Sequence, residues 1–171
     1  MESLAITVVG HDRPGIIAQT AEVLSEHGMN LEDSSMTLLR GHFAMTLICA
    51  GQTEAPALHA ALIAALDDSL SVSVRALPDE GDQPQIGASY LVTVHGADRL
   101  GIVARLASTI AAADGNITDL TTRLAGELYV LVAEVDLPPG TDVPALQAVL
   151  ADASAELGVD TTLRPVENDE L

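Results

Sequence analysis

The first third of the chain shows two hydrophobic periods in succession. Residues 4–10 are rich in branched apolar side chains and end at a turn, which predicts a strand. From residue 14 to residue 27, Ile17, Ala21 and Leu24 recur at spacings of four and three. That spacing predicts a helix that buries these three side chains.

The pattern then continues through a hairpin and a second helix. Residues 29–39 predict a strand, and residues 43–50 are apolar on both faces, which predicts a strand inside a sheet. Residues 53–67 predict a helix and residues 70–77 a last strand. The order β-α-β-β-α-β is the split βαβ, or ferredoxin-like, arrangement.

The same pattern is written twice. A shift of 86 residues superimposes Thr7 on Thr93, and the polar loop residues recur with it; the alignment slips by two or three residues only in the second half of each repeat. The second set of elements is predicted at residues 89–96, 100–114, 116–124, 128–135, 142–157 and 159–163, with Val103, Ala107 and Ile110 on the buried face of its first helix. A period of this length is typical of a duplicated small domain.

The fold class is therefore α+β, with two four-stranded antiparallel sheets, each backed by two helices. We expect a first domain at residues 1–77, a polar linker at 78–87, a second domain at 88–165 and an acidic tail at 166–171. Domains this small have little core of their own. We therefore expect the two sheets to join side by side, within the chain or in a homodimer.

Charge narrows the function classes. The formal net charge of −18 lacks the basic surface that nucleic acids and anionic membranes require, so we expect neither as a direct partner. No apolar stretch is long enough for a membrane span, and the N-terminus lacks the basic segment of a signal peptide. These features predict a cytoplasmic protein.

Catalytic and metal-binding patterns are missing from the sequence. Cys49 is the lone cysteine and falls mid-strand, which predicts a core residue, and the five histidines lack metal-ligand spacing. Neither a phosphate-binding P-loop nor a dinucleotide fingerprint occurs. The sequence thus predicts no metal, no cofactor and no enzymatic activity, although small ferredoxin-like enzymes keep an enzyme open as an alternative.

The repeated loop is the predicted site. Residues 10–16 leave a strand and open a helix, so free backbone N–H groups and the positive end of the helix dipole point at any molecule bound there. Gly15 permits close approach, and Asp12 adds a carboxylate. Together they suit a zwitterion, whose carboxylate binds the amides and whose ammonium binds Asp12. Asn30 adds an amide from a neighbouring sheet.

Structural roles compete with these assignments. Asp12 has a second interpretation as the helix cap. Pro14 and Gly15 can be interpreted as residues that only shape the turn. Asn30 and its repeat Asn116 can be interpreted as residues that take a left-handed backbone angle after the helix. Arg13 and Arg99 are equally suited to surface ion pairs. His11 lies beside the loop, as a surface residue or a ligand contact.

These loop residues carry a family resemblance. The string 12–16, Asp-Arg-Pro-Gly-Ile, followed by Gly-Met-Asn-Leu-Glu-Asp-Ser at 28–34, resembles the tandem ACT-domain proteins, a family of small-molecule-sensing modules, and among them the glycine cleavage system transcriptional repressors. The resemblance covers nearly the whole chain. It departs from the pattern where Pro14 becomes Leu100, where Gly28 becomes Asp114, and where Asp12 replaces the usual Asn.

The resemblance implies ligand contacts in both repeats. Asp12 and Asn30, and their repeats Asp98 and Asn116, match the positions that often touch amino acids. The predicted ligand-binding set is Gly10, His11, Asp12, Arg13, Gly15, Ile16, Asn30, Leu31, Asp98, Arg99, Gly101, Ile102, Asn116 and Ile117.

We therefore expect a regulatory protein that senses a small effector, with an amino acid such as glycine implied by the resemblance. Its effect on transcription or metabolism would pass through a regulatory protein partner, because the chain is acidic and lacks a helix-turn-helix. A protein-interaction module without any small ligand is the main alternative.

Overall fold

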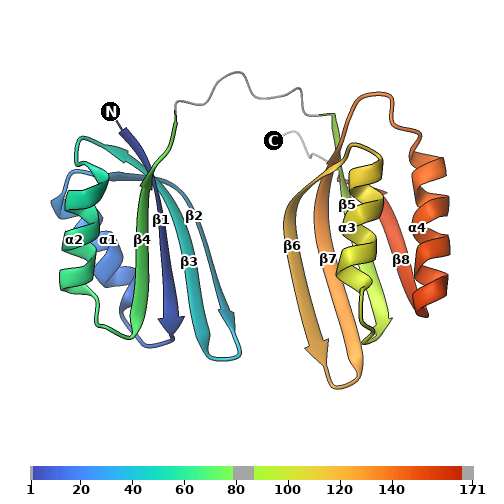
Figure 1. The fold of residues 1–171 in the computed structure, drawn as a ribbon, viewed down its shortest axis with the longest axis horizontal. Coiled ribbons are helices and arrows are strands. Elements are labelled where there is room, and N and C mark those ends of the chain that lie inside the picture. Colours follow the sequence, from blue (N-terminus) through green and yellow to red (C-terminus); the bar gives the residue numbers. More distant parts are fainter. Residues whose placement is uncertain (1, 79–86, 167–171) are drawn as a thin grey trace. The chain divides into compact units, whose positions relative to one another are not determined.

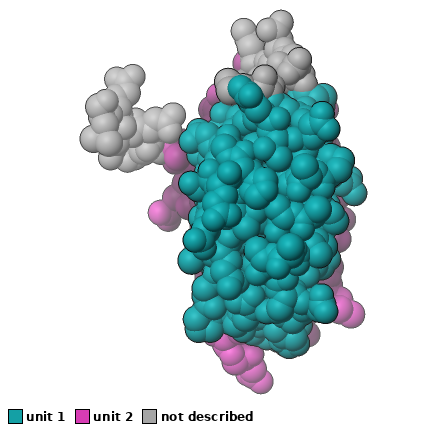
Figure 2. Space-filling model, turned by 90° about the vertical axis from the view of Figure 1, so that its left-hand side faces the viewer, with its two compact units in different colours: residues 1–82 teal, residues 83–171 magenta. Residues whose placement is uncertain are grey.

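The computed structural model describes residues 2–78 and 87–166. The chain divides into two compact units, residues 1–82 and 83–171, called here the N-terminal and C-terminal units (Figure 2). Most of the predicted linker, residues 79–86, and of the predicted tail, residues 167–171, lies outside the described residues.

Each unit is a four-stranded antiparallel sheet with two helices on one face (Figure 1). The N-terminal unit contains β1 (Glu2–His11), α1 (Ile16–Glu26), β2 (Asn30–Leu39), β3 (His42–Gly51), α2 (Ala55–Ala65) and β4 (Leu70–Ala76), with strand order β2-β3-β1-β4. The C-terminal unit contains β5 (Ala88–Ala97), α3 (Ile102–Ala112), β6 (Asn116–Ala125), β7 (Leu128–Leu137), α4 (Val143–Leu157) and β8 (Val159–Pro165), with order β6-β7-β5-β8. The predicted element order and fold class are confirmed.

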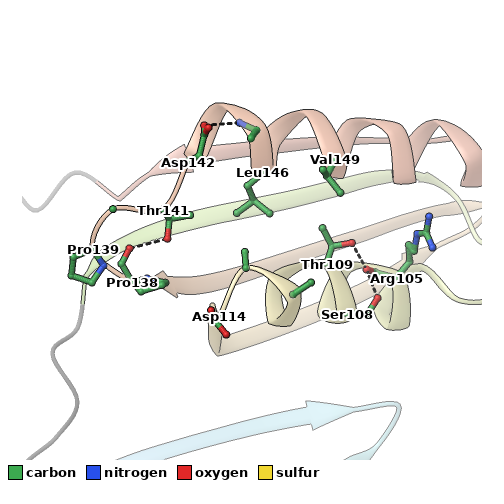
Figure 3. Close-up of a pocket in the computed structure, with 14 residues that line it drawn as sticks. Arg105, Ser108, Thr109, Asp114, Pro138, Pro139, Thr141, Asp142, Leu146 and Val149 are labelled. Carbon is green, nitrogen blue, oxygen red and sulfur yellow. Dashed lines mark hydrogen bonds between the residues drawn. The ribbon is translucent and has the colours of Figure 1, made fainter.

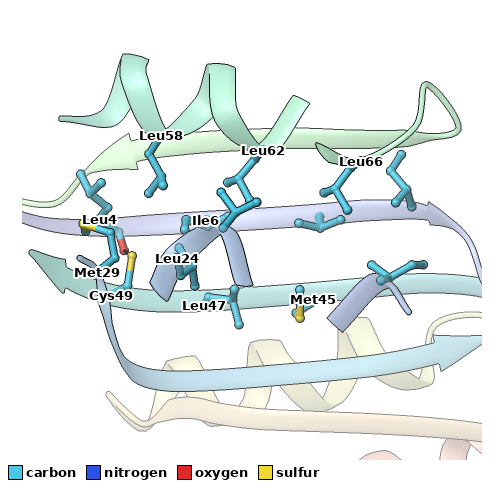
Figure 4. Close-up of a cluster of buried hydrophobic side chains, with 14 of the residues drawn as sticks. Leu4, Ile6, Leu24, Met29, Met45, Leu47, Cys49, Leu58, Leu62 and Leu66 are labelled. Carbon is cyan, nitrogen blue, oxygen red and sulfur yellow. Dashed lines mark hydrogen bonds between the residues drawn. The ribbon is translucent and has the colours of Figure 1, made fainter. Parts of the chain in front are cut away.

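The core of the N-terminal unit lies between the sheet and its helices (Figure 4). Alternate residues of β1, such as Leu4 and Ile6, point to this side, and Leu58 and Leu62 of α2 pack on them; all four are fully buried. Cys49 lies in the same layer, where its thiol donates to the carbonyl oxygen of Leu4 at 3.7 Å. The interpretation of Cys49 as a core residue is confirmed.

Of the three α1 residues predicted to be buried, Leu24 is buried, and the prediction is wrong for Ile17 and Ala21. Ile16, Thr20, Val23 and Leu24 are buried, whereas Ile17 is 50% exposed. Two sets of residues on this helix have helical spacing, one beginning at Ile16 and one at Ile17. The set that begins at Ile16 is the buried one, but it includes the polar Thr20 and therefore looked less apolar in the sequence. Thr20 can be buried because its hydroxyl donates to the carbonyl oxygen of Ile16 at 2.8 Å.

The same error recurs in α3. The buried residues there are Ile102, Leu106 and Ile110, of which only Ile110 was predicted. Val103 is 38% exposed, and Ala107 is half-buried. The helix is therefore rotated relative to the prediction in the same direction as α1.

The strands β2 and β6 lie at the edges of their sheets. On β2, Met36 and Leu38 pair with the buried residues Met45 and Phe43 of β3, so they face the helix side, yet each is about half exposed. The third strand, β3, is internal, as its apolar faces predicted. Within residues 2–78 and 87–166, no helix is both long and apolar enough to cross a membrane.

Candidate functional site

The loop between β1 and α1 is shaped by Gly15. This residue caps the helix in the left-handed region, at φ +93°, and no side chain caps α1. The interpretation of Asp12 as the helix cap is therefore wrong: its exposed carboxylate makes no hydrogen bond at the cap, and its backbone amide donates to the carbonyl oxygen of Gly41 at 3.1 Å. A Cβ on Gly15 would meet no atom within 4 Å, so the backbone angle alone favours glycine there.

The uncapped helix leaves three amides without intrahelical acceptors. The first helical bond runs from Gln19 N to Gly15 O, at 2.9 Å, so the N–H groups of Ile16, Ile17 and Ala18 precede it. They border a hollow of about 480 Å³ that residues 12–18 form with Met36 and Phe43. Ile16 is almost fully buried, whereas Ile17 and Ala18 are exposed.

Arg13 ties the loop to the far end of α2. Its Nε lies 2.6 Å from Asp67 Oδ2, and its Nη2 donates to Gln19 at 3.0 Å. Hydrogen bonds from the Ser69 hydroxyl and amide, reinforced by Arg13, hold the pKa of Asp67 below its ordinary value. The ion-pair interpretation of Arg13 is confirmed.

The loop of the C-terminal unit repeats the backbone but changes the side chains. Gly101 caps α3 at φ +93°, and Arg105 N donates to its carbonyl oxygen at 2.8 Å. The ion pair is made here by Arg105 with Glu156, at 3.0 Å. Among the residues described, Arg99 forms no ion pair, so its predicted ion pair is absent there. Leu100, in the place of Pro14, is 99% exposed.

Two neighbours of the first loop have structural roles of their own. A Cβ on Gly10 would overlap the carbonyl oxygen of Ser69 and the side chain of Leu70, so glycine is required where β1 pairs with the start of β4. His11 is exposed, and its ring lies edge-on to that of His42, with 5.0 Å between centroids.

Asn30 and Leu31 lie at the opposite end of the same sheet. Asn30 pairs with Ala50, whereas His11 pairs with His42, eight residues away along β3. At about 3.4 Å per residue this separates Asn30 from the loop by roughly 27 Å. Asn30 and Leu31 line a different hollow, of about 390 Å³, with the end of α1. One unit therefore does not bring the two halves of the predicted site together.

The left-handed residues after the helices are not the asparagines. Gly28 at φ +65° and Asp114 at φ +54° take that conformation, two residues before Asn30 and Asn116. The alternative role suggested for the asparagines is therefore wrong. Ile117, beside Asn116, packs against the core of the C-terminal unit.

One pocket in the C-terminal unit was not predicted from the sequence. It has a volume of about 810 Å³ and lies between α3, α4 and the segment 138–142 (Figure 3). The slip in the repeat alignment was the signal, because β7 and α4 are joined by five residues, 138–142, where β3 and α2 are joined by three, 52–54. No cluster of metal-ligating side chains occurs in the part of the chain that the structure describes.

Comparison with known proteins gives the following matches. The model of the ACT domain family matches twice, over residues 2–75 and 89–164. A UPF0237 protein of Methanopyrus kandleri is 50% identical over 48 residues, which are 28% of this chain and 53% of that protein, so the chain spans about half the length of this relative. The glycine cleavage system transcriptional repressor of Escherichia coli is 25% identical over 171 residues, with 95% of this chain and 90% of that protein covered. The crystal structure of an unknown protein from Galdieria sulphuraria superimposes with a TM-score of 0.82 at 27% identity, covering 97% of this chain and 99% of that one.

Proposed function

Because the chain belongs to the ACT domain family, we propose that it is a non-enzymatic regulatory protein that senses a small molecule. An amino acid such as glycine is the proposed ligand. The relative from Escherichia coli, a glycine cleavage system transcriptional repressor, supports this choice. The net charge of −18 disfavours direct contact with nucleic acid, so the proposed output passes through a partner protein.

The repeated loop geometry carries the proposal. Gly15 and Gly101 adopt the same φ of +93°, and neither helix after them has a side-chain cap. The free amides of the first helical turn suit a carboxylate, which the helix dipole also favours. Asp12 and Asp98 are exposed beside these amides and suit an ammonium group. A zwitterion satisfies both halves of the arrangement.

Asn30 and Asn116 can contribute to such a site only if two ACT units pair with each other. Because Asn30 lies at the far end of its own sheet, it can complete only the loop site of another ACT unit. The exposed edge strands β2 and β6 suit side-by-side pairing, either within this chain or between two copies in a homodimer. Ligand bound across such a junction would stabilise one arrangement and thereby change the surface offered to a partner.

A protein-interaction module without a small ligand is the second candidate. Met36 and Leu38 on the edge strand β2 are each about half exposed, and an unpaired edge with apolar side chains is suited to adding a strand from a partner.

A thermal-shift screen of the full chain against the twenty amino acids separates the two candidates. A ligand present at about 100 times its Kd stabilises the folded state by roughly 2.7 kcal/mol. We expect a rise in melting temperature with a small amino acid, reduced by Asp12→Ala or Asp98→Ala. A protein whose melting temperature is unmoved by every amino acid at millimolar concentration is not an amino-acid sensor, and the interaction module would replace it.

A further inference from the structure

The pocket between α3 and α4 is a feature that the loop sites do not use. Its volume of about 810 Å³ lies within the range of small-molecule sites, roughly 300–1,000 Å³. Leu146 and Val149 of α4 point into it in Figure 3, and alanines of α3 form the facing wall. It is therefore a hollow of mixed apolar and polar lining, large enough for a small organic molecule.

The two units differ at the seam between their helices. In the N-terminal unit, the hydroxyl of Thr53 donates to the carbonyl oxygen of His27 at 2.7 Å, which ties the start of α2 to the end of α1. The His27 ring is itself held 2.8 Å from the carbonyl oxygen of Val23. In the C-terminal unit, Ala113 stands in the place of His27, and Thr141 donates within its own loop, to Pro138 at 2.8 Å. The C-terminal unit therefore has a longer loop before α4, and its loop threonine bonds within that loop and not to the end of α3.

Some polar groups around the pocket already form hydrogen bonds within the protein, and others do not. The hydroxyls of Ser108 and Thr109 both donate to the carbonyl oxygen of Arg105, at 3.0 and 2.9 Å. Asp142 accepts from the amide of Ala145 at 3.0 Å, which engages one of its oxygens. The carboxylate of Asp114 has no hydrogen bond or ion pair within the described ranges. Three charged residues line the pocket: the Arg105 guanidinium, which is paired with Glu156 at 3.0 Å, and the carboxylates of Asp114 and Asp142.

Asp114 is an unfavourable residue for its position. It follows the C-cap Ala113 at φ +54°, a conformation that suits glycine, and Gly28 occupies the same place in the N-terminal unit at φ +65°. Its carboxylate also lies at the negative end of the α3 dipole. A bound cation would relieve this electrostatic cost.

We propose that the pocket between α3 and α4 binds a small organic cation, an amine whose aliphatic or aromatic body lies on Leu146 and Val149 and whose ammonium group lies between Asp114 and Asp142. Figure 3 shows both residues at the same end of the pocket, on opposite walls: Asp142 is the N-cap of α4, and Asp114 follows the C-cap of α3. The proposal is independent of ligand binding at the β1–α1 and β5–α3 loops.

Titration calorimetry of the full chain with 2-phenylethylamine tests the proposal, with 2-phenylethanol as the neutral probe of equal shape. Two variants change the pocket. Asp114→Gly removes the carboxylate and restores the residue of the N-terminal unit, and Ala113→His places a bulky ring at a residue that lines the pocket. Asp119→Asn, on the exposed strand β6, removes one negative charge away from the pocket and is the matched control.

We expect one amine bound per chain, with 2-phenylethanol at least tenfold weaker. Loss of one carboxylate partner should weaken the amine about fivefold, which corresponds to roughly 1 kcal/mol. Ala113→His should abolish binding, and Asp119→Asn should leave it unchanged. Asp114→Gly should also raise the melting temperature without ligand, so its loss of binding is not a loss of folding.

Three results would overturn the proposal: equal binding of the amine and the alcohol, equal weakening by Asp114→Gly and Asp119→Asn, or no amine binding at millimolar concentration. The second would show a general attraction of cations to an acidic chain. None of these results bears on the amino-acid screen, because that screen is read through Asp12 and Asp98.

Discussion

Replacing Gly15 with alanine tests the loop geometry on which the proposed sensing site depends. Gly15 has φ +93° and ψ −4°, and a Cβ there meets no heavy atom within 4 Å. Any loss of stability in Gly15→Ala must therefore come from the backbone conformation and not from a clash.

The expected magnitude follows from two opposing effects. An L-residue in the left-handed region costs about 1–2 kcal/mol, and the stiffer unfolded chain of the alanine variant offsets about 0.4–1 kcal/mol of this cost. The net destabilisation should be about 1 kcal/mol. For a unit of this size, that lowers the melting temperature by roughly 4–8 °C.

Urea unfolding followed by far-UV circular dichroism measures the loss. Tyr90 and Tyr129 are the two tyrosines of a chain without tryptophan, and both lie in the C-terminal unit, so tyrosine fluorescence follows that unit alone. Gly15→Ala should move the dichroism transition, and the matched Gly101→Ala should also move the fluorescence. Gly15→Asn should cost less than Gly15→Ala, because asparagine tolerates left-handed angles better.

A Gly15→Ala variant as stable as the parent protein would refute the reasoning, because it would show that the loop does not hold a positive φ. A loss far above about 2 kcal/mol would also contradict it, since the backbone penalty alone cannot supply more.

Three further predictions concern the N-terminal unit. The fold lowers the pKa of Asp67 from 3.8, so the stability that this carboxylate contributes is present above pH 3.8 and is lost as the pH falls through the lower folded pKa. In Asp67→Asn, the urea midpoint should therefore fall less steeply with decreasing pH, measured between about pH 5 and pH 2. Burial raises the pKa of the Cys49 thiol, so a colorimetric disulfide reagent should leave it unmodified in the native protein at neutral pH and titrate it fully in urea; rapid native labelling would contradict its place in the core. Leu62→Ala, at a fully buried position, should lower the free energy of unfolding in urea by about 2–5 kcal/mol. Ile63→Ala, on the exposed side of α2, should change it by less than about 1 kcal/mol, and similar losses in the two variants would contradict the packing of α2 on the sheet through Leu62.

Element order was predictable because each element carries its own period. Strand β3 alternates around Phe43 and Met45, and its apolar second face correctly indicated an internal position. The faces of α1 and α3 were not predictable, since Ile16 and Ile17 are both apolar and periodicity alone does not choose between adjacent stripes. The buried Thr20 decides the face, and only the fold reveals its hydrogen bond to Ile16.

The candidate site was predictable in part. The repeated Asp-Arg at 12–13 and 98–99 correctly marked a loop before a helix, and Gly15 and Gly101 proved to be helix caps. The sequence could not reveal that Asp12 does not cap α1, because the N-cap position is held by Gly15 in a left-handed conformation that cannot be read from residue types alone. It also could not pair Arg13 with Asp67, which lies 54 residues away along the chain.

The pocket of the C-terminal unit was concealed for a different reason. Its walls are built from small residues such as Ala112 and Ala113, whose pattern is that of an ordinary helix. The conformation of residues 138–142 shapes one side of the pocket. This loop contains two prolines and a glycine and has no hydrophobic periodicity from which its conformation could be predicted. The mismatch between repeats marked the position without indicating its consequence.

Amide NMR of the full, ¹⁵N-labelled chain titrated with glycine tests the sensing proposal most directly. We expect saturable shifts of the amides of Gly15 to Ala18 or of Gly101 to Ala104, and we expect Asp12→Ala or Asp98→Ala to remove the shifts of its own loop. Unmoved amides in both loops at millimolar glycine, with other amino acids equally silent, would contradict a role for these loops as amino-acid sensors.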